Sequence, residues 1–202
     1  MAITVTNKVL SDVIGPREGN GLLVKRAVLV VLGIAALAIA AKIKVPFWPV
    51  PVTMQTFAVL TIGAAYGTRL GVATLFGYLL VGALGFDVFT SSTAVVNGWA
   101  YMMGGTGGYL LGFLLAAGVL GELARRGWDR SMVTMAAAML IGNAIIYVPG
   151  VLWLGHLYAE AKGWAWVMEW GLYNFILSDA LKLALAALIL PAAWKLVGEA
   201  RS

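Results

Sequence analysis

The chain has 202 residues and a net charge of +5; 61% of its residues are hydrophobic and 11% are charged. A soluble domain carries about 25% charged residues, so this composition excludes a soluble globular protein and indicates an integral membrane protein of one domain. The absence of cysteine excludes disulfides, thiolate metal sites and a cysteine nucleophile, and the basic excess indicates membrane orientation and contact with anionic lipid, because no nucleic-acid motif accompanies it.

The first 24 residues are polar and rich in glycine, and they lack the basic-then-apolar order of a cleaved signal peptide. We expect residues 1–24 to form a partly mobile cytoplasmic tail. A single membrane domain is expected over 25–198, followed by a short cytoplasmic tail over 199–202. The sequence contains no GxxxxGK[ST] motif, so any ATP-driven step needs other chains.

Uncharged stretches predict the membrane crossings, because a spanning helix needs about 17–25 mainly apolar residues. The stretches are 27–41, 52–67, 70–86, 88–121, 131–155 and 170–194, the last with one internal pair of charges. The fourth is longer than one helix requires, so we expect a loop or re-entrant segment over 88–97 and a helix over about 99–121. The sequence therefore predicts an all-α membrane protein, a six-transmembrane-helix bundle.

The distribution of basic residues predicts the orientation of this bundle. With the N-terminus inside, ten of the fourteen Lys and Arg residues fall in inner segments, and the outer loops hold only Lys42, Lys44 and Lys162. This asymmetry follows the positive-inside rule. Since an even number of crossings returns the chain to its starting side, we expect both termini to be cytoplasmic, in a multi-pass protein of a prokaryotic inner membrane.

The first outer loop, residues 44–53, reads KVPFWPVPVT. Its three prolines fix φ and remove hydrogen-bond donors, which predicts a stiff, extended strap. The strap places two large aromatic residues, Phe47 and Trp48, where a ligand from outside would arrive. We consider two roles for it, a lid over a binding site and a short connector anchored among the lipid headgroups.

Small residues recur every four positions along the fourth stretch, at Gly104, Gly108, Gly112 and Ala116. Such a stripe lets helix backbones approach closely, so we expect a packing role for Gly108 and Gly112. The run MGGTGGY over 103–109 is denser in glycine than packing requires, which predicts a loosened helix with accessible backbone groups. Thr106 and Tyr109 are as well suited to lining a site as to packing.

Asp179 and Lys182 are the charged pair inside the last apolar stretch. A charge near the middle of a membrane costs about 2.5–3.5 kcal/mol on insertion scales, so such residues mark functional sites. Their i,i+3 spacing places both side chains on one helix face, where they present an acceptor and a cation to the same small molecule. The alternative is a mutual ion pair that only holds helices together.

Three segments of the chain read PVPVTMQTFAVLTIGAAYG (49–67), YMMGGTGGYLLGF (101–113) and LSDALKLALAALILPAAWKL (177–196). Together and in this order they resemble the BioY family, the biotin-specific substrate-binding subunits (S-components) of energy-coupling-factor (ECF) transporters. Two positions depart from the usual family pattern, since Gly105 stands where a proline is usual and Ser178 where a glycine is usual. The loop 90–97 also lacks an arginine that some relatives carry there.

The resemblance implies a membrane subunit that captures biotin with high affinity from outside. It implies delivery inward with a transmembrane coupling subunit and two ATP-binding subunits, with biotin as the transported ligand and no cofactor. Asp179 is then expected to accept from the ureido N–H groups, while Lys182 either holds the carboxylate or keeps Asp179 ionised. Further candidates for the binding site are Asn97 and Thr106 as donors to the ureido carbonyl, Trp99, Tyr101, Tyr109 and Trp153 as apolar walls, and Thr53 and Gln55 beneath the lid.

Other functions find less support in the sequence. An intramembrane enzyme using Asp179 as acid or base would need a second catalytic group in another span, and we find none. A stand-alone or proton-coupled carrier would tend to show internal repeats with paired broken helices. His156 is the only histidine, so we expect neither a metal site nor a Ser-His-Asp triad. Operation without a dedicated energising module, and a homo-oligomeric state, both stay open.

Overall fold

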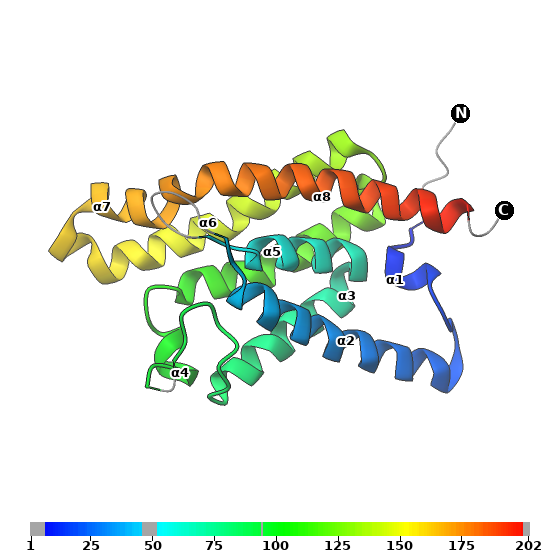
Figure 1. Cartoon of the computed structure of the whole chain (residues 1–202), viewed down its shortest axis with the longest axis horizontal. Helices are drawn as coiled ribbons and strands as arrows, with labels where there is room; N and C mark the ends of the chain where they lie inside the picture. The colour runs from blue at the N-terminus through cyan, green and yellow to red at the C-terminus, as the bar shows by residue number, and fades with distance from the viewer. Residues whose placement is uncertain (1–6, 46–51, 94, 200–202) are drawn as a thin grey trace.

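The computed structural model describes residues 7–45, 52–93 and 95–199, and helices make up most of them (Figure 1). Five segments are long and apolar enough to cross a membrane, which confirms the prediction of an all-α membrane protein. They are α2 (Gly19–Lys42), α3 (Gln55–Ala83), α5 (Gly107–Arg125), α6 (Met132–Lys162) and the continuous segment Trp164–Gly198. That last segment contains α7 (Trp164–Met168), the π-helical turn η2 (Glu169–Tyr173) and most of α8 (Asn174–Glu199).

The remaining elements are short. They are α1 (Leu10–Val13), the two antiparallel strands β1 (Lys44–Val45) and β2 (Val52–Thr53), α4 (Gly98–Met102) and the 3₁₀ turn η1 (Trp128–Arg130). The strand pair closes the base of the proline-rich loop, and the proposed lid residues Phe47 and Trp48 lie outside the described residues. Figure 1 places α1 and the end of α8 at one end of the bundle, with α4 and α7 at the other.

Helix α3 consists of two antiparallel arms that meet at Gly67. This residue has φ 77° and ψ 172°, a conformation essentially restricted to glycine. A Cβ atom on Gly71 would lie 3.3 Å from the Cα of Gly63, and Gln55 Nε2 donates to the Tyr78 hydroxyl at 2.9 Å. A straight helix, which rises 1.5 Å per residue, cannot make these contacts. The chain therefore reverses at Gly67, and the two arms correspond to the second and third stretches expected from the sequence.

The α3 hairpin, α5 and α6 form the centre of the bundle, and their backbones meet at small residues. A Cβ on Gly63 would lie 2.8 Å from the Cα of Ala117 in α5, and one on Gly112 would lie 2.7 Å from the Cα of Ile146 in α6. A Cβ on Gly108 would lie 2.2 Å from the carbonyl oxygen of Pro149 in α6. These approaches confirm the packing role predicted for Gly108 and Gly112.

The prediction of one continuous helix over about 99–121 is wrong at its N-terminal end. Helix α4 ends at Met102 and α5 begins at Gly107, with a turn between them. Glycine costs about 1 kcal/mol relative to alanine inside a helix, so the two glycine pairs weaken the helix at this point. The indole of Trp153 in α6 donates to the carbonyl oxygen of Gly104 at 2.8 Å, and the Gly107 N–H donates to the same oxygen at 3.1 Å, so both bonds hold the turn between the two helices.

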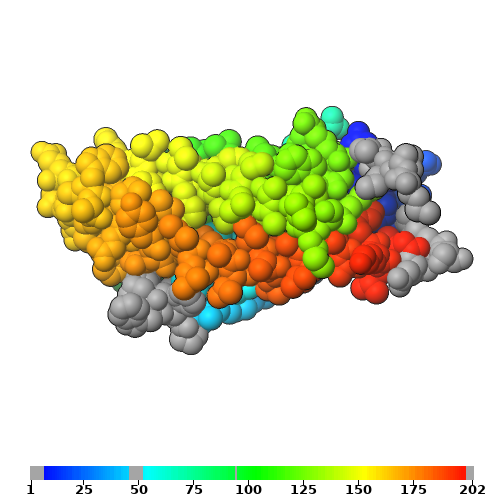
Figure 2. Space-filling model, turned by 90° about the horizontal axis from the view of Figure 1, so that it is seen from above, coloured from blue at the N-terminus to red at the C-terminus, as the bar shows by residue number. Residues whose placement is uncertain are grey.

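Helices α6 and α8 lie side by side along one face of the molecule (Figure 2). At the end near α1, the indole of Trp194 in α8 donates to Asp129 Oδ2 at 2.6 Å, which ties α8 to η1. Burial raises the pKa of Asp129 to about 6. The polar N-terminal segment also joins the bundle here, since Val9 and Leu10 are buried in the hydrophobic core.

Candidate functional site

A cavity of about 600 Å³ lies among α3, α5, α6, α7 and α8 and the loop that follows α3. Its wall is mostly apolar and aromatic, with a few polar groups at separate points. This composition is typical of sites that bind small molecules. The polar groups fall into three sets, a charged cluster on α8, a hydrogen-bonded network at the start of α3, and one lysine at the end of α6.

The charged cluster is centred on Asp179. Its side chain is 5% exposed and forms an ion pair of 2.8 Å with Lys182, whose side chain is 11% exposed. Thr56 of α3 bridges the pair, because its hydroxyl donates to Asp179 Oδ1 at 3.2 Å and accepts from Lys182 Nζ at 2.9 Å. Tyr147 of α6 donates to Asp179 Oδ2. Three helices therefore converge on one buried carboxylate, which explains how this charge is stabilised within the bundle.

The second set of polar groups begins at Gln55, the first residue of α3. Its amide donates to the Tyr78 hydroxyl at 2.9 Å, and its carbonyl accepts from Thr90 at 2.7 Å. Tyr78 in turn donates to the Val88 carbonyl at 2.8 Å. These bonds join both arms of the α3 hairpin to the loop that follows it, and they hold Thr90 and Ser91 against the cavity.

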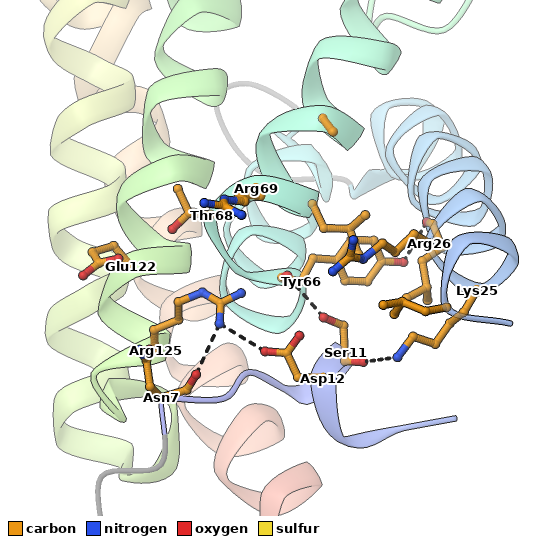
Figure 3. A pocket seen from close by; sticks show the side chains of 14 residues that line it. Asn7, Ser11, Asp12, Lys25, Arg26, Tyr66, Thr68, Arg69, Glu122 and Arg125 are labelled. Carbon is orange, nitrogen blue, oxygen red and sulfur yellow. Dashed lines mark hydrogen bonds and ion pairs between the residues drawn. The ribbon is translucent and has the colours of Figure 1, made fainter. Parts of the chain in front are cut away.

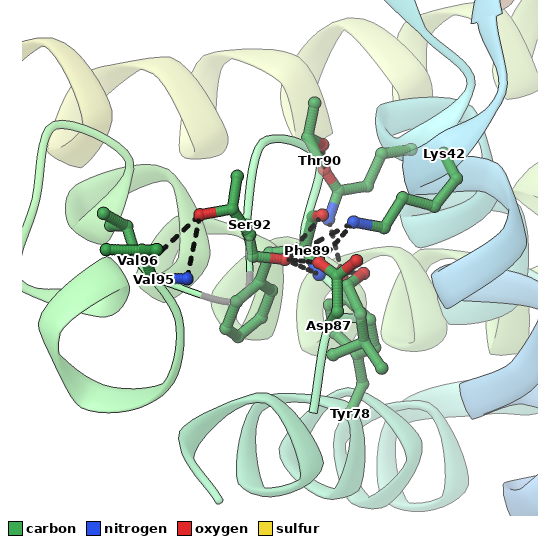
Figure 4. A network of polar contacts seen from close by, with 11 residues as sticks. Lys42, Tyr78, Asp87, Phe89, Thr90, Ser92, Val95 and Val96 are labelled. Atoms are coloured by element: carbon green, nitrogen blue, oxygen red, sulfur yellow. Dashed lines mark hydrogen bonds and ion pairs between the residues drawn. The ribbon is translucent and has the colours of Figure 1, made fainter. Parts of the chain in front are cut away.

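The same loop is anchored at its outer side, as Figure 4 shows. Lys42 at the end of α2 forms an ion pair of 2.6 Å with Asp87, and Ser92 donates to the same carboxylate. The bonds from Lys42 and Ser92 lower the pKa of Asp87 below its ordinary value. Phe89 is fully buried and stacks on Tyr101 with ring centres 5.0 Å apart. The buried Phe89 and Ser92 therefore hold the first part of the expected loop 88–97 against the bundle, whereas Val95 and Val96 are exposed.

Aromatic side chains line much of the remaining surface. Tyr109 of α5 donates to the carbonyl oxygen of Gly171 at 2.7 Å, which fixes its ring between α5 and the π-helical turn. Towards α7, the ring of Trp166 lies 5.8 Å from Tyr158 and 6.2 Å from Trp170, measured between centres. All four rings line the cavity. Such a surface suits a flat, apolar ring system.

Lys162, the last residue of α6, lines the cavity at the end near α7. Its ammonium lies 4.6 Å from the centre of the Trp166 ring, a cation–π contact that holds the charge beside the cavity. Lys162 and Tyr147 are fifteen residues apart on α6, which corresponds to about 22 Å along a helix. The cavity therefore has a charged cluster at one end and a separate cation at the other.

A family model described as the BioY family matches residues 8–199. The chain belongs to the BioY family. It is 34% identical over 165 residues to a protein of Pyrococcus horikoshii named "Probable biotin transporter BioY", covering 82% of this chain and 93% of that one. It is also 34% identical over 155 residues to "Biotin transporter BioY" of Thermotoga maritima, covering 77% of this chain and 87% of the relative.

The fold is similar to a crystal structure at 2.1 Å of the S-component for biotin from an ECF-type ABC transporter. The TM-score is 0.69, and the match covers 88% of this chain and 95% of the other at 21% sequence identity. The likeness shows a shared fold. The named relatives of this BioY-family chain are transporters, which identifies it as a multi-pass membrane protein of the transporter class and not an enzyme.

In this BioY-family chain, seven of the ten predicted binding residues line one cavity. They are Thr53, Gln55, Tyr101, Thr106, Tyr109, Asp179 and Lys182. The structure places the other three elsewhere. Asn97 precedes α4 as its N-cap residue, Trp99 is 65% exposed, and Trp153 turns its indole to Gly104.

Several residues of the site were missed by the reasoning from sequence. The principal ones are Thr56, Thr90, Tyr147, Tyr158, Lys162 and Trp166. Tyr147, Leu154 and Tyr158 are spaced seven and four residues apart, so all three lie on one face of α6, a signal that the sequence did contain. In the part of the chain that the structure describes, no three His, Asp or Glu side chains are placed to hold a metal ion.

Proposed function

We propose that this chain is a biotin-binding membrane subunit that captures the vitamin from outside the cell and delivers it inward. The observation that carries the proposal is the buried group of Asp179, Lys182, Thr56 and Tyr147, facing a cavity in a chain whose relatives are named biotin transporters. Delivery is driven by an energy-coupling module made of a transmembrane subunit and two ATP-binding subunits. The membrane is that of a prokaryotic cell.

The chain crosses this membrane six times, with both ends in the cytoplasm. The reversal at Gly67 supports this count, because the two arms of α3 run in opposite directions. The first arm, 55–66, is only about 18 Å long at 1.5 Å per residue, less than the roughly 30 Å of a bilayer core. The short strand β2 therefore lies at membrane depth, where it brings Thr53 to the cavity.

The charged cluster recognises the ureido group of biotin. A carboxylate offers about four acceptor positions, and Asp179 uses three of them for Lys182, Thr56 and Tyr147. An ammonium has three donors, and Lys182 uses two for Asp179 and Thr56. One acceptor position, on Oδ2, and one ammonium donor therefore stay available, which matches a ureido N–H and its neighbouring carbonyl. Thr106 and the network around Gln55 face the same ligand, and the aromatic wall contacts its thioether ring.

Lys162 binds the valerate carboxylate at the other end of the cavity. The charge of Lys182 is neutralised by Asp179 at 2.8 Å, whereas Lys162 contacts only an aromatic face among the contacts described for it. The charged residues lining the cavity, Asp179, Lys182 and Lys162, sum to +1, which complements a monovalent acid. On this proposal Lys182 keeps Asp179 ionised, and the ion pair between them supports assigning the carboxylate to Lys162.

Ligand binding to the purified protein tests the proposal. Biotin raises the melting temperature, because a ligand that binds only the native state stabilises it by about 2.7 kcal/mol at one hundred times its dissociation constant. Thiamine and riboflavin leave it unchanged. Asp179→Asn loses the biotin response, and the matched variant Glu160→Gln, which changes an exposed carboxylate outside the cavity lining, retains it. Unchanged melting of the wild type at saturating biotin would overturn the ligand assignment.

A further inference from the structure

A second cavity of about 640 Å³ lies at the opposite end of the bundle, beside α1 and the reversal at Gly67 (Figures 1 and 3). Residues from the N-terminal segment, α2, α3 and α5 line it, and none of them lines the cavity that contains Asp179. This cavity is therefore separate from the proposed biotin site, and the kind of ligand that it binds has to be inferred from its own lining residues.

Two helix faces form the sides of this second cavity. On each face, the basic residues are followed one turn deeper in the bundle by an apolar residue. On α2 the lining residues follow the i, i+3, i+4, i+7 spacing of one helix face: Leu22, Lys25, Arg26 and Leu29. On the second arm of α3 the lining residues are Arg69, Leu70 and Ala73. Arg26 and Arg69 thus lie near the end of the bundle, and Leu29 and Ala73 lie one turn deeper.

The inner end of the cavity is closed by direct helix packing. A Cβ on Gly33 of α2 would lie 2.5 Å from the Thr74 side chain of α3, and one on Gly77 would lie 2.9 Å from the Ile34 side chain. The cavity is therefore a shallow recess at the end of the bundle and not a passage through it. Such a recess suits a lipid headgroup, and the acyl chains of that lipid would extend out of it along the side of the bundle.

The charges that line the recess are unbalanced. Lys25, Arg26, Arg69 and Arg125 stand against Asp12 and Glu122, so the formal charge is four minus two, or +2. Both carboxylates are already engaged, Asp12 with Arg125 at 3.1 Å and Glu122 with Arg126 at 3.0 Å. Lys25 donates to the carbonyl oxygens of Ser11 and Ile14, at 3.0 Å each.

Arg26 and Arg69 have no hydrogen bond or ion pair within the described part of the chain. Figure 3 shows Arg26 on the α2 side of the recess and Arg69 beside Thr68 on the α3 side. Tyr66 is fixed against α2, because its hydroxyl donates to the Leu29 carbonyl at 3.0 Å. Two guanidinium groups with free donors therefore line the same recess.

We propose that this recess binds the phosphate-bearing headgroup of an anionic phospholipid. The planar fork of arginine matches phosphate oxygens, and basic pockets between helices at the cytoplasmic surface suit such headgroups. The apolar residues below the arginines favour a lipid over a free phosphate ion. Next to the recess, Val28, Val31 and Leu32 of α2 are 49–64% exposed, so an apolar surface is present for the acyl chains.

Lipid binding to the purified full-length protein, measured by native mass spectrometry in detergent, tests this proposal. The probes are phosphatidylglycerol and phosphatidylcholine with identical acyl chains, together with inorganic phosphate as a competitor. The test variant is Arg26→Gln/Arg69→Gln, and both substituted residues are exposed and carry no structural bond in the described chain. The control is Lys195→Gln, which removes an exposed cation of α8 outside the recess lining.

We expect the wild type and the control to bind phosphatidylglycerol more tightly than phosphatidylcholine. The double variant should lose about 30-fold in affinity for the anionic lipid, at roughly 1 kcal/mol for each arginine. Equal affinity in all three proteins would overturn the proposal. Phosphate that binds as tightly as phosphatidylglycerol would overturn the lipid assignment. Unchanged melting of both variants in phosphatidylcholine shows that they fold.

Discussion

The carboxylate of Asp179 is nearly saturated by the protein's own donors. Lys182, Thr56 and Tyr147 reach it from three helices, so its position is fixed before a ligand arrives. Such preorganisation lowers the entropic cost of binding. It also commits Lys182 to an internal ion pair, which is why we propose Lys162 as the group that holds the ligand carboxylate.

Lys162→Ala should weaken binding of biotin by roughly tenfold, the loss expected for one hydrogen bond to a charged group of about 1.5 kcal/mol. Biotin amide, in which the carboxylate is neutral, should bind the variant and the wild type equally. Lys44→Ala, which removes an exposed lysine of β1 outside the cavity lining, serves as the control. Isothermal titration of the three proteins with both ligands measures the six affinities. An equal loss for biotin and its amide would show that Lys162 acts on something other than the carboxylate.

A single functional residue can be predicted from the sequence when placing it in its surroundings carries a high free-energy cost. Asp179 and Lys182 are charged residues in an apolar span, so the free-energy cost of placing them there marks them in the sequence alone. Thr56 and Tyr147 carry no such cost, because their hydroxyl groups are tolerated throughout membrane helices, and they were missed. Trp153 was expected in the wall of the cavity, but an aromatic residue type does not reveal where its ring points, and its indole bonds to Gly104.

At the scale of elements, Gly67 is the residue that makes one long apolar segment into a hairpin. Gly67→Ala should destabilise the protein by about 1–3 kcal/mol, the usual strain of a conformation restricted to glycine. The new Cβ would also lie 3.0 Å from both Arg125 and Val9. Gly118→Ala on α5 is the matched control, since its Cβ meets only Val72 at 3.4 Å, an ordinary contact. Thermal unfolding in detergent compares the two, and equal melting temperatures would contradict this role of Gly67.

The boundaries of the elements could be predicted where charge or glycine marks them. The uncharged stretches located the long helices, and the density of glycine over 103–109 indicated a loosened segment there. The complete break between α4 and α5 was not predicted, because it depends on the Trp153 indole, which arrives from another helix. The burial of Phe89 beneath the loop after α3 is likewise a tertiary contact that local sequence does not encode.

For the whole molecule, the proposed six crossings place α7 and the end of α6 outside the cell and the end of α5 inside. Because the chain has no cysteine, single cysteines introduced at exposed positions report their side without further changes. Glu160→Cys should react with a membrane-impermeant maleimide on intact cells, whereas Arg126→Cys should react only after permeabilisation. Labelling of both residues from the same side would refute the proposed topology.

The π-helical turn η2 has a consequence for how this protein can change through mutation. A π turn holds about one more residue than an α turn, and one residue rotates everything beyond it by about 100° around the helix axis. Deleting a single residue there would swing Asp179 and Lys182 together out of reach of Thr56 and Tyr147, although no group of the site had been altered. The number of residues in Glu169–Tyr173 therefore has to be kept, as do the charged residues themselves, for the site to form.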